Sequence, residues 1–128
     1  MTRILNLLPL ISFCALIFWL SDQSILQSPL TFRAQDKVVH MGAYFIMGIL
    51  AWRGFIPFVK KPLNNAILCF VYCALFGFSD EWHQFFVPGR HCDILDWYAD
   101  MVGAAIATLV LYKMSSRTIL LDPELPRN

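Results

Sequence analysis

Charged residues are scarce in this 128-residue sequence: Asp, Glu, Lys and Arg make up 15% of it, whereas hydrophobic residues make up 58%. A soluble domain of this size exposes too much surface to be covered by so few charges. The mean hydropathy of +0.57 and the grouping of apolar residues into blocks indicate membrane-spanning segments instead. The net charge is only +1 and no basic cluster occurs, which excludes a nucleic-acid-binding surface.

Cysteine is also sparse. Three of the four cysteines, Cys14, Cys69 and Cys73, lie within apolar runs, where a thiol acts as a small hydrophobic group. Only Cys92 lies in a polar segment, so we predict no disulfide framework. The sequence also lacks G-x-S-x-G, H-E-x-x-H and P-loop motifs, so no catalytic class is recognised and no cofactor is expected.

Four apolar runs predict an all-α fold, an integral membrane four-helix bundle. The first run covers roughly 25 Å as a helix, near the lower limit for a membrane span, and Pro9 is expected to kink it. Lys60, Lys61 and Pro62 are expected to end the second helix. The predicted helices cover about 4–20, 37–59, 63–80 and 94–113 in a single transmembrane domain, 1–114, followed by a disordered tail, 115–128.

The distribution of Lys and Arg predicts the orientation of the helices. If both termini are cytoplasmic, Arg33, Lys37 and Arg90 are the three basic residues left outside, against seven inside. The polar segment Ser79–Asp100, which contains five of the nine acidic residues, then joins the third and fourth helices on the outer side. The orientation with both termini in the cytoplasm is therefore predicted.

Polar residues recur at helical spacing near the predicted outer ends of three helices. Asp36, His40 and Tyr44 follow one another at four-residue steps and so share one helix face. Small residues continue such faces toward the membrane centre and allow close helix packing. We therefore predict a polar pocket formed by Asp36, Lys37, His40, Tyr44, Glu81, Gln84, Arg90, Asp96 and Asp100, with helix packing at Gly77, Ala99, Gly103 and Ala107.

The predicted outer cluster contains seven acids against three bases, so static salt bridges cannot pair every carboxylate. Asp100 lies about one turn inside its helix and needs a partner, for which Lys37, Arg90 and His40 are the candidates. Glu81 and His83 do not share a helix face, so we predict no metal site. Such a site would require His40 to meet Glu81 and Asp96 from different helices.

The segment FVPGR, residues 86–90, predicts a turn. Pro88 fixes φ and Gly89 permits a positive φ, so Arg90 is presented at a defined place, suited to a phosphate or a carboxylate. Phe85 and Phe86, which precede the turn, allow the loop to be re-entrant in the membrane or to lie along its surface. In a purely structural interpretation, Glu81, Gln84 and Arg90 instead hold this loop against the second helix.

At these residues the sequence resembles the VanZ-like family of small bacterial membrane proteins. The resemblance covers about 100 residues in the order expected of the family. It is carried by four segments: IFWLSDQS (17–24), DKVVHMGAYFIMG (36–48), DEWHQFFVPGR (80–90) and DILDWYADMVGAAIA (93–107). The resemblance implies a multi-pass protein of the bacterial inner membrane, and it links the founding member of the family to teicoplanin resistance.

Three functional hypotheses follow. In the first, the outer pocket binds an envelope lipid headgroup, a lipid-linked cell-wall precursor or a glycopeptide-type antibiotic, with Arg90 and Lys37 meeting phosphate. In the second, the protein is an intramembrane enzyme in which His40 or Glu81 acts as a base on a lipid headgroup. In the third, the polar network only holds the bundle together. The lipid bilayer is a partner in all three.

Overall fold

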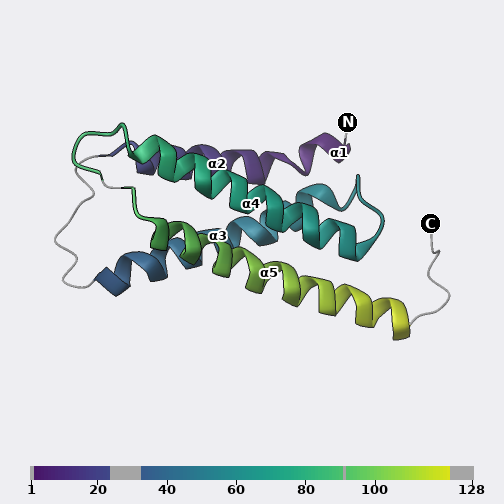
Figure 1. The fold of residues 1–128 in the computed structure, drawn as a ribbon. Coiled ribbons are helices and arrows are strands. Elements are labelled where there is room, and N and C mark those ends of the chain that lie inside the picture. The colour runs from purple at the N-terminus through teal and green to yellow at the C-terminus, as the bar shows by residue number, and fades with distance from the viewer. Residues whose placement is uncertain (1, 24–32, 91, 122–128) are drawn as a thin grey trace.

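The computed structural model describes residues 2–23, 33–90 and 92–121, and every regular element among them is an α-helix (Figure 1). The predicted all-α bundle is confirmed, with a first helical turn that stands apart from the longer helices. The five elements are α1 (Thr2–Leu5), α2 (Leu8–Ser21), α3 (Arg33–Phe55), α4 (Pro62–Gln84) and α5 (Ile94–Leu121).

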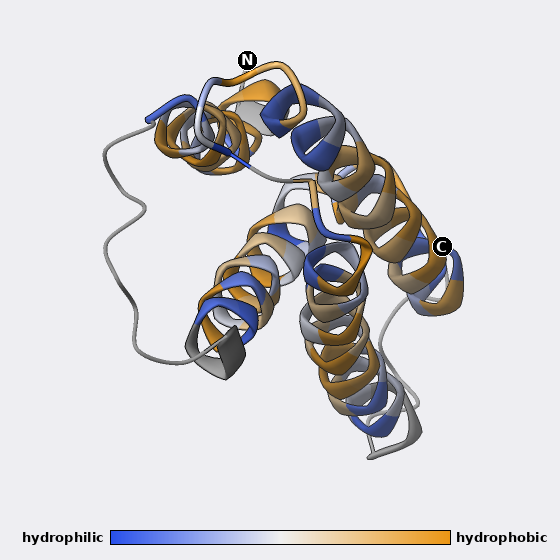
Figure 2. Cartoon of the chain, turned by 60° about the vertical axis from the view of Figure 1, so that its left-hand side comes forward, coloured by the Kyte–Doolittle hydropathy of each residue, from blue (hydrophilic) through white to orange (hydrophobic). Residues whose placement is uncertain are grey.

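Three of the helices are long and apolar enough to cross a membrane: Asp36–Phe55 within α3, all of α4, and Ile94–Thr118 within α5. Large apolar side chains on these helices point away from the protein; Leu75 is 65% exposed and Leu109 is 57% exposed. Water would not favour such a surface, whereas lipid chains would. Figure 2 shows the same pattern, with hydrophobic residues along the helices and hydrophilic residues gathered toward their ends.

The first predicted helix, 4–20, is divided. Its N-terminal part forms α1, and α2 begins only at Leu8, so Pro9 lies in the first turn of α2. The helix is interrupted at Asn6 and Leu7, directly before Pro9, so the disturbance predicted at Pro9 is present as a break instead of a bend within one helix. Proline suits the first turn of a helix because the amide that it lacks has no partner there. The resulting 14-residue α2 is shorter than a full membrane span.

The second helix ends earlier than predicted, at Phe55 instead of residue 59. Pro57 accounts for the difference, because proline disfavours the helical conformation at the residue before it. The next helix, α4, begins at Pro62 directly after Lys61, as the break at this proline predicts.

The two remaining helices extend beyond their predicted ends, 80 and 113. No glycine or proline interrupts the chain between residues 80 and 84 or between 104 and 121, so the polar residues there continue the helices. α5 reaches Leu121, and the prediction of a disordered tail is wrong for 115–121. The rest of that tail, 122–128, and Ser24 of the IFWLSDQS segment lie outside the described residues.

Figure 1 shows how the helices are arranged: α2 and α4 lie side by side, and α3 and α5 cross beside them. α2 and α4 end where α3 and α5 begin; we call this the polar end. α3 and α5 approach closely, since a Cβ on Gly103 would collide with the Met41 carbonyl oxygen. The buried core between the helices includes Tyr44, Met47, Cys69 and Ala104.

Candidate functional site

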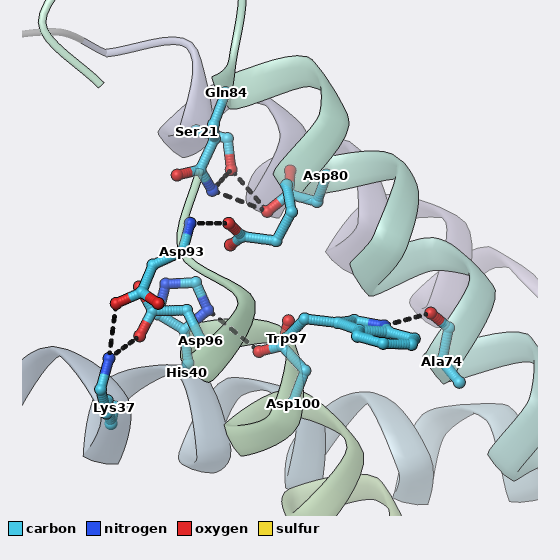
Figure 3. Close-up of polar contacts among 11 residues, drawn as sticks. Ser21, Lys37, His40, Ala74, Asp80, Gln84, Asp93, Asp96, Trp97 and Asp100 are labelled. Atoms are coloured by element: carbon cyan, nitrogen blue, oxygen red, sulfur yellow. Dashed lines mark hydrogen bonds and ion pairs between the residues drawn. The ribbon is translucent and has the colours of Figure 1, made fainter. Parts of the chain in front are cut away.

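The nine residues of the predicted polar pocket lie toward the polar end of the bundle, on α3, α4, α5 and the loop between α4 and α5. Figure 3 labels five of them: Lys37, His40, Gln84, Asp96 and Asp100. The most deeply buried carboxylate among them, that of Asp100 on α5, is in contact with His40 on α3. His40 Nδ1 lies 3.0 Å from Asp100 Oδ1, and Asp100 is completely buried. Of the three partners considered for Asp100, the structure therefore selects His40.

Lys37 joins α3 to the start of α5 nearer the surface. Its ammonium nitrogen lies 2.7 Å from Asp96 Oδ1 and 3.0 Å from Asp93 Oδ2. The Asp96 side chain is only 8% exposed, so this contact compensates a largely buried charge. Because Lys37 is held by two carboxylates, the phosphate contact predicted for it would require breaking these ion pairs.

A second polar cluster fastens α2 to α4. Ser21 donates a hydrogen bond to Asp80 Oδ2 at 2.8 Å, and the Gln84 amide donates to the same oxygen at 3.2 Å. The Arg90 guanidinium donates to the Leu20 carbonyl oxygen at 2.8 Å, at the C-terminal end of α2. Gln84 and Arg90 thus hold α2, whereas the structural interpretation expected them to hold the helix that became α3.

The loop between α4 and α5 contains the predicted turn. Gly89 has φ of +83°, and the Arg90 amide donates to the Val87 carbonyl oxygen at 3.1 Å. Further along, the Asp93 amide donates to Glu81 Oε2, and Asp93 Oδ1 caps α5 by accepting from the Leu95 amide, both at 2.9 Å. The Glu81 carboxylate on α4 therefore holds the end of the loop at Asp93.

Cys92 is the exposed cysteine of this loop. Partial burial, and after it the negative charge of Glu81, raise the pKa of the Cys92 thiol. The thiol is therefore less nucleophilic than an ordinary surface cysteine at neutral pH. Cys14, Cys69 and Cys73 are buried among the helices, in agreement with their expected role as packing residues.

A cavity of about 230 Å³ opens at the polar end. Its wall is apolar on the side of α2 and α3, where Leu20 and Val39 reach the lipid-exposed surface with 37% and 60% of their area exposed. Polar groups line the remainder. The lining residues are Ile17, Leu20, Ser21, Asp36, Val39, His40, Ala43, Tyr44, Asp80, Gln84 and Arg90.

Several buried polar atoms at this end have no hydrogen-bond partner within the described part of the chain. They are the Tyr44 hydroxyl, Asp80 Oδ1, Glu81 Oε1, Asp100 Oδ2 and Arg90 Nε. Buried polar groups are nearly always satisfied in proteins, because each one left without a partner costs about 1–3 kcal/mol. Of these residues, Tyr44, Asp80 and Arg90 line the cavity, which therefore offers a hydroxyl, a carboxylate acceptor and a guanidinium donor.

The predicted packing residues lie where α3, α4 and α5 meet. A Cβ on Gly77 would come within 2.9 Å of Asp100 Oδ2, and the Ala107 methyl group would lie 2.9 Å from a Cβ on Gly48. Together with the contact between Gly103 and α3, these close approaches fix the spacing of the three helices that carry the polar cluster. Ala99 is only partly buried.

Two groups of side chains are close enough to share a metal ion, although no metal site was predicted. In each group the candidate ligand atoms lie within 4.8 Å of one another. The groups are Asp36, His40 and Asp96, and His40, Glu81 and Asp100.

Two site residues were missed in the prediction. Asp80 lies four residues before Gln84, and this spacing could have identified it. Ser21 has no such pattern, because its role depends on α2 reaching the end of α4. Trp97 donates its indole hydrogen to the Ala74 carbonyl oxygen at 2.9 Å and joins α5 to α4.

Comparison with known families gives one finding. The family model described as VanZ/LLP1 matches residues 1–117. No curated protein and no solved structure matches the chain.

Proposed function

Because the chain belongs to the VanZ/LLP1 family, we propose that it recognises a membrane amphiphile by its headgroup, in the cavity at the polar end. The ligand class is an envelope lipid or a lipid-linked cell-wall precursor. The link of the family's founding member to teicoplanin resistance supports an envelope ligand, because glycopeptide antibiotics act in the envelope. The proposal includes residence in a bacterial inner membrane with both termini cytoplasmic.

The observation that carries the proposal is the shape of the cavity. It joins lipid-exposed apolar side chains, such as Leu20 and Val39, to buried polar groups, including Tyr44 and Asp80. A ligand confined to water would gain nothing from the apolar side. A lipid can place an acyl chain against α2 and α3 while its headgroup enters between the helices, so both parts are satisfied.

The polar atoms in the cavity indicate the chemistry of the headgroup. Asp80 Oδ1 is an acceptor without a partner among the described residues and suits an amine or a sugar hydroxyl. Arg90 Nε is a donor that no described residue engages, and it suits a phosphate oxygen. A phosphate-bearing headgroup with hydroxyl or amine donors complements both.

The positive-inside rule supports the orientation. Arg53, Lys60, Lys61, Lys113 and Arg117 lie toward the end of the bundle opposite the cavity. The cavity then opens on the outer side, where lipid-linked precursors are used.

Native mass spectrometry of the gently extracted protein tests the proposal. We expect a co-purifying phospholipid or polyprenyl-linked species. Loss of a charge-assisted hydrogen bond in Arg90→Ala should reduce its occupancy about 10–100-fold. Arg53→Ala, which removes an exposed guanidinium at the opposite end, is the matched control and should retain the lipid. If Arg90→Ala folds and keeps wild-type occupancy, the proposal is wrong.

The pair formed by His40 and Asp100 supports a second candidate, an enzyme acting on the headgroup. A buried carboxylate that holds one imidazole nitrogen orients the ring as a general base. His40 also lines the cavity. Turnover of the co-purified lipid by wild-type protein, with loss in His40→Gln at unchanged lipid occupancy, would establish this role. Binding without turnover would leave recognition as the function.

A further inference from the structure

Three side chains from three different helices converge beside the cavity. His40 of α3, Glu81 of α4 and Asp100 of α5 each offer a ligand atom, and these atoms lie within 4.8 Å of one another. We propose that this group binds one divalent transition-metal ion, Zn²⁺ or Mn²⁺, and so cross-links the three helices at the polar end. The proposal is independent of the lipid-binding function.

The donor set favours this class of ion. One imidazole nitrogen and two carboxylates suit Zn²⁺ or Mn²⁺, whereas Ca²⁺ prefers six to eight oxygen ligands. An ion about 2.1 Å from each of two ligand atoms holds those atoms roughly 3.0–3.4 Å apart. His40 Nδ1 and Asp100 Oδ1 are 3.0 Å apart, so their separation suits a shared ion as well as a hydrogen bond.

Unpartnered atoms point to a ligand in the same place. Glu81 and Asp100 are 4% and 0% exposed, and each has one carboxylate oxygen without a partner among the described residues. The Tyr44 hydroxyl, outside the proposed ligand set, is likewise buried and without a described partner. A Cβ on Gly77 would touch both Asp100 Oδ2 and the Tyr44 ring, so these two groups are neighbours.

The charges at this depth also require compensation. Glu81 and Asp100 face a single imidazole, while the ammonium group of Lys37 is engaged by Asp93 and Asp96. Two buried carboxylates near one histidine are costly, because a buried charge without a partner destabilises a protein by several kcal/mol. A divalent cation would neutralise both carboxylates at once.

The alternative group, Asp36, His40 and Asp96, is less suited to an ion. Asp36 is exposed. The carboxylate of Asp96 is already bound by the Lys37 ammonium at 2.7 Å. An ion there would have to displace the Lys37 ammonium group from Asp96. Its other carboxylate ligand, Asp36, is already solvated and would have to give up that solvation.

Metal titration of the full-length protein in detergent, after removal of bound metal with a chelator, tests the proposal. We expect isothermal titration with ZnCl₂ or MnCl₂ to show one ion per chain. Removal of one ligand in Glu81→Gln or Asp100→Asn should weaken binding at least roughly 100-fold. Asp22→Asn is the carboxylate control, since Asp22 belongs to neither candidate metal group, and His83→Gln is the histidine control. Both should bind within about threefold of wild type.

Three results would overturn the proposal. The first is the absence of stoichiometric Zn²⁺ and Mn²⁺ binding by folded wild-type protein. The second is wild-type affinity in Glu81→Gln and Asp100→Asn. The third is loss of binding in Asp96→Asn with retention in Glu81→Gln, which would place the ion in the alternative group.

A measurement on wild-type protein covers the case in which a ligand variant fails to fold. Co²⁺ held by one imidazole and two carboxylates in a four- or five-coordinate site absorbs visible light more strongly than hydrated Co²⁺, and Zn²⁺ should abolish this absorption by competition. A Co²⁺-loaded protein with only the spectrum of hydrated Co²⁺ would contradict the ligand set. Metal binding without lipid binding, or the reverse, separates this proposal from the proposed function.

Discussion

The close crossing of α3 and α5 can be tested by adding one methyl group. In Gly103→Ala the new Cβ would overlap the Met41 carbonyl oxygen and lie 3.0 Å from the Phe45 amide nitrogen. Both obstacles are backbone atoms, so the helices must separate. Alanine gains about 1 kcal/mol over glycine in a helix, whereas overpacking costs about 1–3 kcal/mol or more. Because both obstacles are backbone atoms, we place the overpacking cost at about 3 kcal/mol or slightly more. The free energy of unfolding of Gly103→Ala should therefore fall by about 2 kcal/mol.

Gly42→Ala is the matched control. Gly42 lies on α3, and apart from the backbone of its own helix and its chain neighbours, a Cβ there would have no atom of the described residues within 4 Å. This variant gains the helix propensity without the collision, so its free energy of unfolding should be unchanged or higher by up to about 1 kcal/mol. The two variants should therefore differ by about 2–3 kcal/mol.

Unfolding of the purified protein by SDS in mixed micelles, followed by far-ultraviolet circular dichroism, measures this difference. Equal stability of Gly103→Ala and Gly42→Ala would refute the close approach of α3 and α5. It would also remove the basis for the placement of His40 beside Asp100, because that pair spans the same two helices.

Three further predictions concern the polar end. Tyr44→Phe should leave the free energy of unfolding unchanged or raise it by about 1 kcal/mol, since the hydroxyl has no described partner, while lipid occupancy falls. Lys37→Met should cost about 2 kcal/mol in denaturant unfolding, below the value for a fully buried pair, because Lys37 is 30% exposed while Asp96 loses its partner. Cys92 should react with a membrane-impermeant maleimide on intact cells, slowly because its thiol pKa is raised, and Glu81→Gln should speed the reaction by lowering that pKa.

Each of these predictions has a control within the chain. Tyr72→Phe removes a hydroxyl 3.2 Å from Cys14 Sγ and should cost about 1 kcal/mol; a similar loss in Tyr44→Phe would mean that the Tyr44 hydroxyl is bonded. Lys60→Met, at the opposite end, should be nearly neutral, and equal losses in both lysine variants would contradict the buried ion pair. Cys69 is fully buried and should not react. Labelling of Cys92 only after the cells are opened would reverse the predicted orientation.

Much of the site followed from spacing alone. Residues four apart share a helix face, so Asp36, His40 and Tyr44 were expected together, and the acid-rich segment was expected to meet them. The structure places these residues at one end of the bundle, and the small residues Gly77 and Gly103 at helix contacts. Periodicity specifies which face is polar because it depends only on local geometry.

Periodicity does not specify the partner across the interface. Three cations were possible for Asp100, and the choice of His40 depends on the crossing of α3 and α5. In the same way, the contact of Arg90 with the Leu20 carbonyl oxygen depends on where the loop after α4 meets α2. The helix ends differ from the prediction for local reasons. Pro57 disfavours the helical conformation at the residue before it, whereas the polar residues after 80 and 113 have no backbone preference that prevents a helix.

The contacts that attach α2 have a consequence for ligand entry. Ser21 and Arg90 line the cavity and also fasten the C-terminal end of α2, through Asp80 and the Leu20 carbonyl oxygen respectively. A headgroup phosphate bound at Arg90 Nε would share the guanidinium with the end of α2, because Arg90 Nη2 donates to the Leu20 carbonyl oxygen. Leu20 and Ser21 line the cavity only while α2 is attached, so occupancy of the cavity and attachment of α2 are thermodynamically linked, and each strengthens the other by the same factor. The end of α2 would therefore be held more firmly in the lipid-bound protein than in the free protein.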